Sequence, residues 1–188
     1  MSVGPHASLR RNLAWTVAGN AVYAACQWGM LVALARLATP AVVGDFAFAL
    51  ALTAPIVVFA MLNLRAAQAT DQCSEFAFGD YVALRVGCLA IAAVALAATL
   101  AVGRFDRTTA LVVAFVALAK LCDALSDVVY GLLQQREWMQ RIAVSRILQG
   151  VLQLAALVAV LRAGAGIVAA TAAMAAMSFA VTVSYDLV

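Results

Sequence analysis

Ionisable residues recur at helical spacing within one long apolar stretch. Lys120, Asp123 and Asp127 lie three and four positions apart, and Gln134 follows seven positions later. At about 100° per residue, these side chains share one face of a helix, within roughly 60° of one another. Lys120 and Asp123 are one turn apart and can pair, whereas Asp127 needs a partner from another helix or from water. This pattern is typical of a site that binds a charged substrate or a coupling ion.

Two further apolar stretches carry polar side chains on one helical face. These are Arg146, Gln149 and Gln153 in one stretch, and Thr16, Asn20, Tyr23 and Gln27 in the other. Three helices with polar stripes predict a shared hydrated cavity. The candidate substrate-binding or coupling residues are therefore Lys120, Asp123, Asp127, Arg146, Gln149, Asn20 and Gln27. Two alternatives stay open: polar residues also join helices without any transport, and Arg146 lies near a helix end, where its side chain can reach the headgroups.

Enzymatic chemistry is not expected. The sequence has no nucleotide-binding loop and no HExxH motif. His6 is the single histidine, and Cys26, Cys73, Cys88 and Cys122 do not have the spacing of metal ligands or a redox pair. We therefore expect no catalytic residues, no metal and no cofactor. A net charge of +3, scattered along the chain, also gives no reason to expect a nucleic-acid partner.

The composition is that of a membrane protein. Of the 188 residues, 66% are hydrophobic and 11% are charged, and the mean hydropathy is +1.02. Soluble domains are nearer half apolar and a quarter charged, so a soluble fold of this length could not cover so much apolar surface. Membrane lipid is thus an expected partner. The expected fold class is an all-α integral membrane protein, because lipid-exposed backbone must satisfy its hydrogen bonds within helices.

Six apolar segments are long enough to cross a bilayer. The expected spans are 13–35, 42–62, 82–102, 110–133, 142–161 and 167–185, with 63–81 as the longest polar connection. Residues 1–12 are expected to form a cytoplasmic N-terminal tail and 13–188 a transmembrane lobe. The first apolar run is too long for a signal-peptide core and should remain as an anchor.

Arginines predict the orientation through their excess on the cytoplasmic side. With the N-terminus inside, that side holds Arg10, Arg11, Arg65, Arg136 and Arg141, together with Arg85 and Arg146 near helix ends. The opposite side holds Arg36, Arg104, Arg107 and Arg162. Both chain ends are therefore expected in the cytoplasm.

Two blocks of sequence resemble a known family. Residues 12–71, with LARLATP, VGDFAFALALTAP and LNLR followed by TD, resemble the start of bacterial polysaccharide-biosynthesis membrane proteins. Residues 118–150, LAKLCDALSDVVYGLLQQREWMQRIAVSRILQG, are similar to that family's fourth and fifth helices. These proteins are the O-antigen and capsule flippase-like exporters of the multidrug/oligosaccharidyl-lipid/polysaccharide superfamily.

The resemblance implies a two-lobe exporter fold, of which this chain would supply one lobe with six transmembrane helices. It implies flipping or export of a polyprenyl-diphosphate-linked saccharide across the bacterial inner membrane, for lipopolysaccharide or other surface polysaccharide. A missing C-terminal half or a second copy is then the expected partner, with the chain a fragment or a truncated gene product. The alternatives are an ion-coupled drug-type exporter and a non-transporting membrane remnant.

Overall fold

The computed structural model of the chain describes residues 5–70 and 77–187. These residues form seven α-helices and a closing π-helical turn, with no strand among them. The elements are α1 (Pro5–Leu37), α2 (Pro40–Met61), α3 (Leu64–Thr70), α4 (Phe78–Val102), α5 (Arg107–Gln135), α6 (Met139–Arg162), α7 (Gly166–Val181) and η1 (Thr182–Asp186).

Six helical stretches are long and apolar enough to cross a membrane: 10–37, 40–70, 78–102, 107–135, 139–162 and 166–186. Each expected span lies inside one of them. Their length and composition indicate an all-α, multi-pass membrane protein. The division into a tail and a transmembrane lobe remains a prediction.

The connection expected over 63–81 differs from the structure, because α3 occupies part of it. The segment LRAAQAT contains good helix formers. Its Leu64 and Gln68, one turn apart, are buried, and α3 packs against α5. A left-handed backbone at Leu62 and Asn63 separates α3 from α2. Asp71, Cys73 and Glu75 lie outside the described residues.

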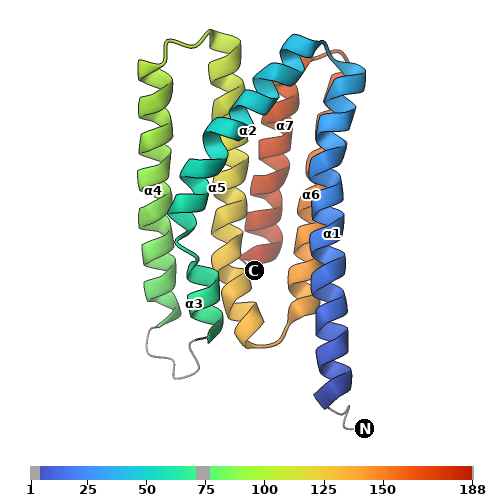
Figure 1. Ribbon diagram of the computed structural model, residues 1–188, viewed down its shortest axis with the longest axis vertical. Helices are drawn as coiled ribbons and strands as arrows, with labels where there is room; N and C mark the ends of the chain where they lie inside the picture. The colour runs from blue at the N-terminus through green and yellow to red at the C-terminus, as the bar shows by residue number, and fades with distance from the viewer. Residues whose placement is uncertain (1–4, 71–76, 188) are drawn as a thin grey trace.

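The helices form a bundle in which α5 is central (Figure 1). It packs against α2, α4 and α7, while α1 lies along α6. Two glycines bring α1 and α6 together. A Cβ at Gly19 would lie 2.7 Å from the Cα of Ala143, and one at Gly150 would lie 3.2 Å from the Cα of Tyr23. A side chain at Gly19 would force the two backbones apart, and one at Gly150 would make an unusually tight contact.

The buried apolar side chains form two separate clusters along the bundle. The main core gathers near the first half of α5, around Val112, Val113 and Val116, with Leu34 of α1 and Met174 of α7. A smaller cluster of Tyr130, Leu133 and Ile142 lies near the α5–α6 turn. On α5, the ionisable residues at 120, 123 and 127 lie between these two clusters.

Candidate functional site

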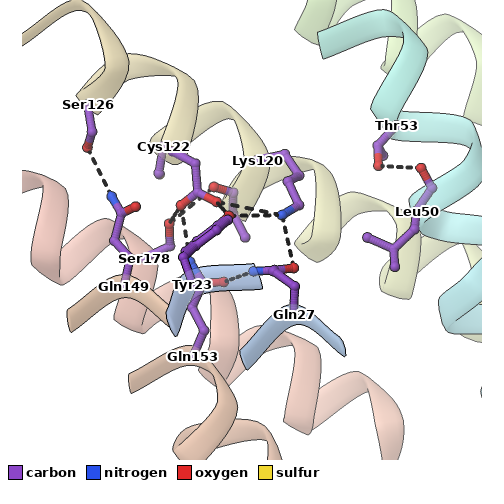
Figure 2. A network of polar contacts seen from close by, with 12 residues as sticks. Tyr23, Gln27, Leu50, Thr53, Lys120, Cys122, Ser126, Gln149, Gln153 and Ser178 are labelled. Carbon is purple, nitrogen blue, oxygen red and sulfur yellow. Dashed lines mark hydrogen bonds and ion pairs between the residues drawn. The ribbon is translucent and has the colours of Figure 1, made fainter. Parts of the chain in front are cut away.

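The three expected polar stripes converge inside the bundle, joined by side chains from the last helix. Figure 2 shows Tyr23 and Gln27 of α1 close to Lys120 of α5, with Gln149 and Gln153 of α6 nearby. Because four helices and η1 contribute, the site depends on the tertiary fold.

Asp123 is the centre of this network. The residue is buried, with 8% of its surface exposed. Oδ2 accepts a 2.9 Å hydrogen bond from the Tyr23 hydroxyl, and Oδ1 accepts bonds of 3.1 Å from Gln153 Nε2 and 2.7 Å from Ser178 Oγ. These donors come from α1, α6 and α7. Asp123 therefore links three helices to α5.

Lys120 pairs with Asp123 as their spacing predicts. Its Nζ lies 3.7 Å from Asp123 Oδ2, and its side chain is 23% exposed. The ammonium also donates to Gln27 Oε1 at 3.3 Å and to the Tyr23 hydroxyl at 3.4 Å. Gln27 in turn donates to Gln153 Oε1 at 3.4 Å. Lys120 is thus a partly exposed cation at the edge of the network.

Asp127 belongs to a separate ion-pair cluster. Its partners are two arginines that the sequence analysis did not assign to the site: Arg85 of α4 at 3.1 Å and Arg65 of α3 at 3.4 Å. Arg65 also donates to Gln134 Oε1 at 3.1 Å. The expectation that Asp127 takes a partner from another helix is confirmed. Two cations already neutralise this carboxylate, which leaves less charge for a ligand.

Arg146 lies between two aromatic rings. Its guanidinium carbon is 4.9 Å from the centroid of the Tyr23 ring and 5.4 Å from that of Tyr130. A guanidinium is attracted to the faces of aromatic rings, and the attraction grows when water is excluded. Its Nε is buried and has no hydrogen-bond partner among the described residues. The side chain is therefore held inside the bundle, contrary to the alternative in which it reaches the headgroups.

Gln149 lies near the Asp123 network and bonds to a second carboxylate, Asp186, which is not among the candidates from the sequence. Asp186, at the end of η1, accepts hydrogen bonds from Ser145 Oγ at 2.6 Å, Gln149 Nε2 at 3.4 Å and the Tyr130 hydroxyl at 3.4 Å. Gln149 also donates to Ser126 Oγ at 3.2 Å, and its Oε1 is buried without a partner among the described residues.

A signal for Asp186 was present in the sequence. Ser178, Thr182 and Asp186 recur every four residues, which is the spacing of one helical face. All three side chains are buried.

Asn20, like Asp127, lies outside the Asp123 network, and its side chain is exposed. The adjacent residue, Gly19, faces α6 instead. About 100° of helical rotation separates neighbouring positions, so Asn20 points away from the α1–α6 contact.

The six long apolar helices are consistent with an all-α, multi-pass membrane protein, and its interior holds ionisable side chains. The chain is 29% identical over 145 residues to "Capsular polysaccharide biosynthesis protein CapF" of Staphylococcus aureus, an alignment covering 77% of this chain and 35% of that protein. The chain thus spans about a third of that relative's length. No family model and no solved structure matches the sequence. Together, the similarity and the six apolar helices fit a polysaccharide-biosynthesis membrane protein.

Proposed function

We propose that the chain is one lobe of a bacterial inner-membrane transporter that flips or exports a lipid-linked oligosaccharide for cell-surface polysaccharide biosynthesis. The similarity to a capsular polysaccharide biosynthesis protein supports the biosynthetic role. The observation that carries the transport role is Arg146, a partly buried cation that lies between the rings of Tyr23 and Tyr130 and outside the three ion pairs of the described residues. An interior cation is costly and is a marker of a substrate or ion pathway.

In this proposal the network recognises the anionic diphosphate of the carrier lipid. Lys120 and Arg146 supply positive charge, and the planar guanidinium of Arg146 can bind phosphate oxygens in a bidentate manner. Gln149 Oε1, which is buried without a partner, can accept a hydrogen bond from a saccharide hydroxyl. Asp123 balances Lys120 in the empty site or takes up a coupling proton. No covalent step is required, so the chain acts as a carrier and not as an enzyme.

Transport by alternating access requires a second lobe. Two lobes rock about a site between them, and a single lobe lines only one wall. The relative is almost three times as long as the matched segment, which leaves room in that protein for such a lobe. We therefore propose that a C-terminal half, or a second copy of this chain, completes the transporter.

Complementation of a bacterial strain that lacks its own flippase tests this function. The chain would be expressed alone, as a tandem fusion of two copies, and together with the part of the Staphylococcus aureus relative that lies outside the matched segment. Surface polysaccharide should return only in a two-lobe arrangement, and Arg146→Gln should abolish it. Arg162→Gln, which alters the exposed last residue of α6, is the control. Export by the monomeric chain in liposomes would contradict the two-lobe proposal. Unchanged surface polysaccharide in the Arg146→Gln variant would contradict the role of Arg146 in substrate binding.

A second candidate is a membrane component that does not transport. The network residues make many hydrogen bonds with one another. Such bonds can hold helices together without any transport, and they favour this second candidate. Under this candidate, Arg146→Gln lowers protein abundance and no arrangement restores export. A drug-type exporter of cations has less support, because Asp123, Asp127 and Asp186 each already accept from several donors.

A further inference from the structure

A pocket of about 400 Å³ lies apart from the network, at the end of the bundle that holds the α5–α6 turn. It opens between the start of α1, the start of α6 and η1. Among its lining residues are Arg11, Trp15, Glu137, Trp138, Arg141 and Tyr185. None of these six side chains takes part in the Asp123 network or the Asp127 cluster, so the proposed transport function gives the pocket no role.

The pocket carries uncompensated positive charge. Arg11 and Arg141 line it, and neither is among the ion pairs of the described part of the chain. Arg141 instead lies over the Tyr185 ring, with its guanidinium carbon 5.8 Å from the ring centroid. Glu137 is the single carboxylate in the lining, and it lies in the exposed turn before α6. The two arginines outweigh it, and the first turn of α6 adds the positive end of a 24-residue helix.

The turn between α5 and α6 fixes the aromatic wall of the pocket. Glu137 has a left-handed backbone with φ 58°, and its N–H donates to the carbonyl of Gln134 at 3.1 Å. The N–H of Trp138 donates to the carbonyl of Leu133 at 2.9 Å. This pair of bonds is the Schellman motif that ends a helix. It sets Trp138 beside Arg141, at the entry to α6.

The aromatic residues locate the pocket at the membrane surface. Trp and Tyr concentrate where a bilayer meets water, because their rings are apolar and their N–H or O–H groups are polar. Trp15 lies one turn after Arg11, at the start of the apolar run of α1, and Tyr185 lies at the end of the last helix. A basic, aromatic pocket between helices at this depth suits a phosphate attached to a lipid.

We propose that this pocket binds the phosphate headgroup of an anionic phospholipid. Arg11 and Arg141 contact the phosphate, and Trp15 and Trp138 lie against the glycerol and the first carbons of the chains. Glu137 weakens the binding through repulsion, because it adds negative charge to the same pocket.

The test measures the melting temperature and tryptophan fluorescence of the purified chain in neutral detergent micelles during titration with phosphatidylglycerol. Phosphatidylcholine and inorganic phosphate are added in parallel. Phosphatidylglycerol should raise the melting temperature and saturate, whereas the other two should not. Arg11→Gln with Arg141→Gln should weaken the apparent affinity by about 25-fold, since each arginine near anionic lipid contributes about fivefold. Arg107→Gln with Arg162→Gln, which removes two exposed arginines at the opposite end, should leave it unchanged.

Glu137→Gln should raise the affinity for phosphatidylglycerol, whereas the double arginine variant should lower it. This second test does not depend on the folding of the double variant. The Glu137→Gln substitution removes the repelling carboxylate at an exposed turn position and should strengthen phosphatidylglycerol binding several-fold. Equal effects of phosphatidylcholine and phosphatidylglycerol would overturn the proposal, as would full binding by the Arg11/Arg141 variant. A shift with inorganic phosphate as large as that with phosphatidylglycerol would make this a site for free anions and overturn the lipid assignment.

Discussion

Arg85 of α4 and Asp127 of α5 form an ion pair in which Nη2 and Oδ2 lie 3.1 Å apart, and the arginine side chain has no exposed surface. Nη1 of Arg85 also donates to the carbonyl of Met61 at the end of α2, at 2.9 Å. One side chain therefore ties three helices together. Removing one partner of a buried pair is costly, because it leaves the other charge without compensation.

Arg85→Met should destabilise the protein by about 3–5 kcal/mol, because Asp127 then keeps only the more exposed Arg65. Arg85→Met combined with Asp127→Asn should recover part of that loss. Arg65→Met is the matched control and should cost less, since its side chain is 24% exposed. The measurement is the melting temperature of detergent-solubilised protein. Equal losses for Arg85→Met and Arg65→Met would show that burial of Arg85 does not control the energy of the pair.

Gly19→Leu should disrupt the contact between α1 and α6. A Cβ at this position would lie 2.7 Å from backbone Cα of Ala143, so the helices would have to separate. Overpacking of this kind costs about 1–3 kcal/mol. Gly87→Leu on α4 is the control, because a Cβ there meets nothing within 4 Å. Abundance in the membrane and monodispersity after solubilisation should fall for Gly19→Leu alone. Equal behaviour of the two variants would contradict the close packing of α1 on α6.

The orientation predicted from the arginines can be tested at the two ends of α4. Gly79 lies in its first turn, and Gly103 follows its last residue. A reporter that is active only in the periplasm should give a signal when fused at Gly103 and none when fused at Gly79. The reverse pattern would invert the orientation and leave the number of spans unchanged.

Asp106, in the short turn between α4 and α5, gives a prediction about pH. Hydrogen bonds from the Thr109 side chain and backbone, and from the backbone N–H of Thr108, stabilise its charged form and lower the pKa of this carboxyl. The stabilisation is fully present above the ordinary aspartate pKa of about 3.9, and it is lost as pH falls through the lower folded-state value. The difference in melting temperature between wild type and Asp106→Asn should therefore shrink on acidification below about pH 4. A difference that grows at low pH would contradict this assignment.

The sequence predicted the fold more completely than the site, for physical reasons visible in particular residues. Hydropathy and helical period depend on local sequence, so all six apolar stretches could be predicted, as could the pairing of Lys120 with Asp123 one turn away. The partners of Asp127 could not, because Arg65 and Arg85 reach it only through tertiary packing. The expected position of Asn20 rested on polarity alone. The close contact between α1 and α6 is set by Gly19, which has no side chain, and Asn20 therefore lies on an exposed face of α1.

Arg146 distinguishes a transport role for the network from a purely structural one. Arg146→Lys keeps the charge but removes the planar group that lies between the rings of Tyr23 and Tyr130. If the guanidinium binds a diphosphate, this variant should reach near wild-type abundance in the membrane. Export should fall by roughly tenfold or more, because about one bidentate charged contact with the substrate is lost. Export is measured in whichever two-lobe arrangement restores surface polysaccharide, and abundance by immunoblot of the same membranes. Arg162→Lys, at an exposed site, should change neither quantity. A fall in abundance that accounts for the whole loss of export would instead assign Arg146 to holding α1, α5 and α6 together, through the aromatic contacts that it makes with Tyr23 and Tyr130.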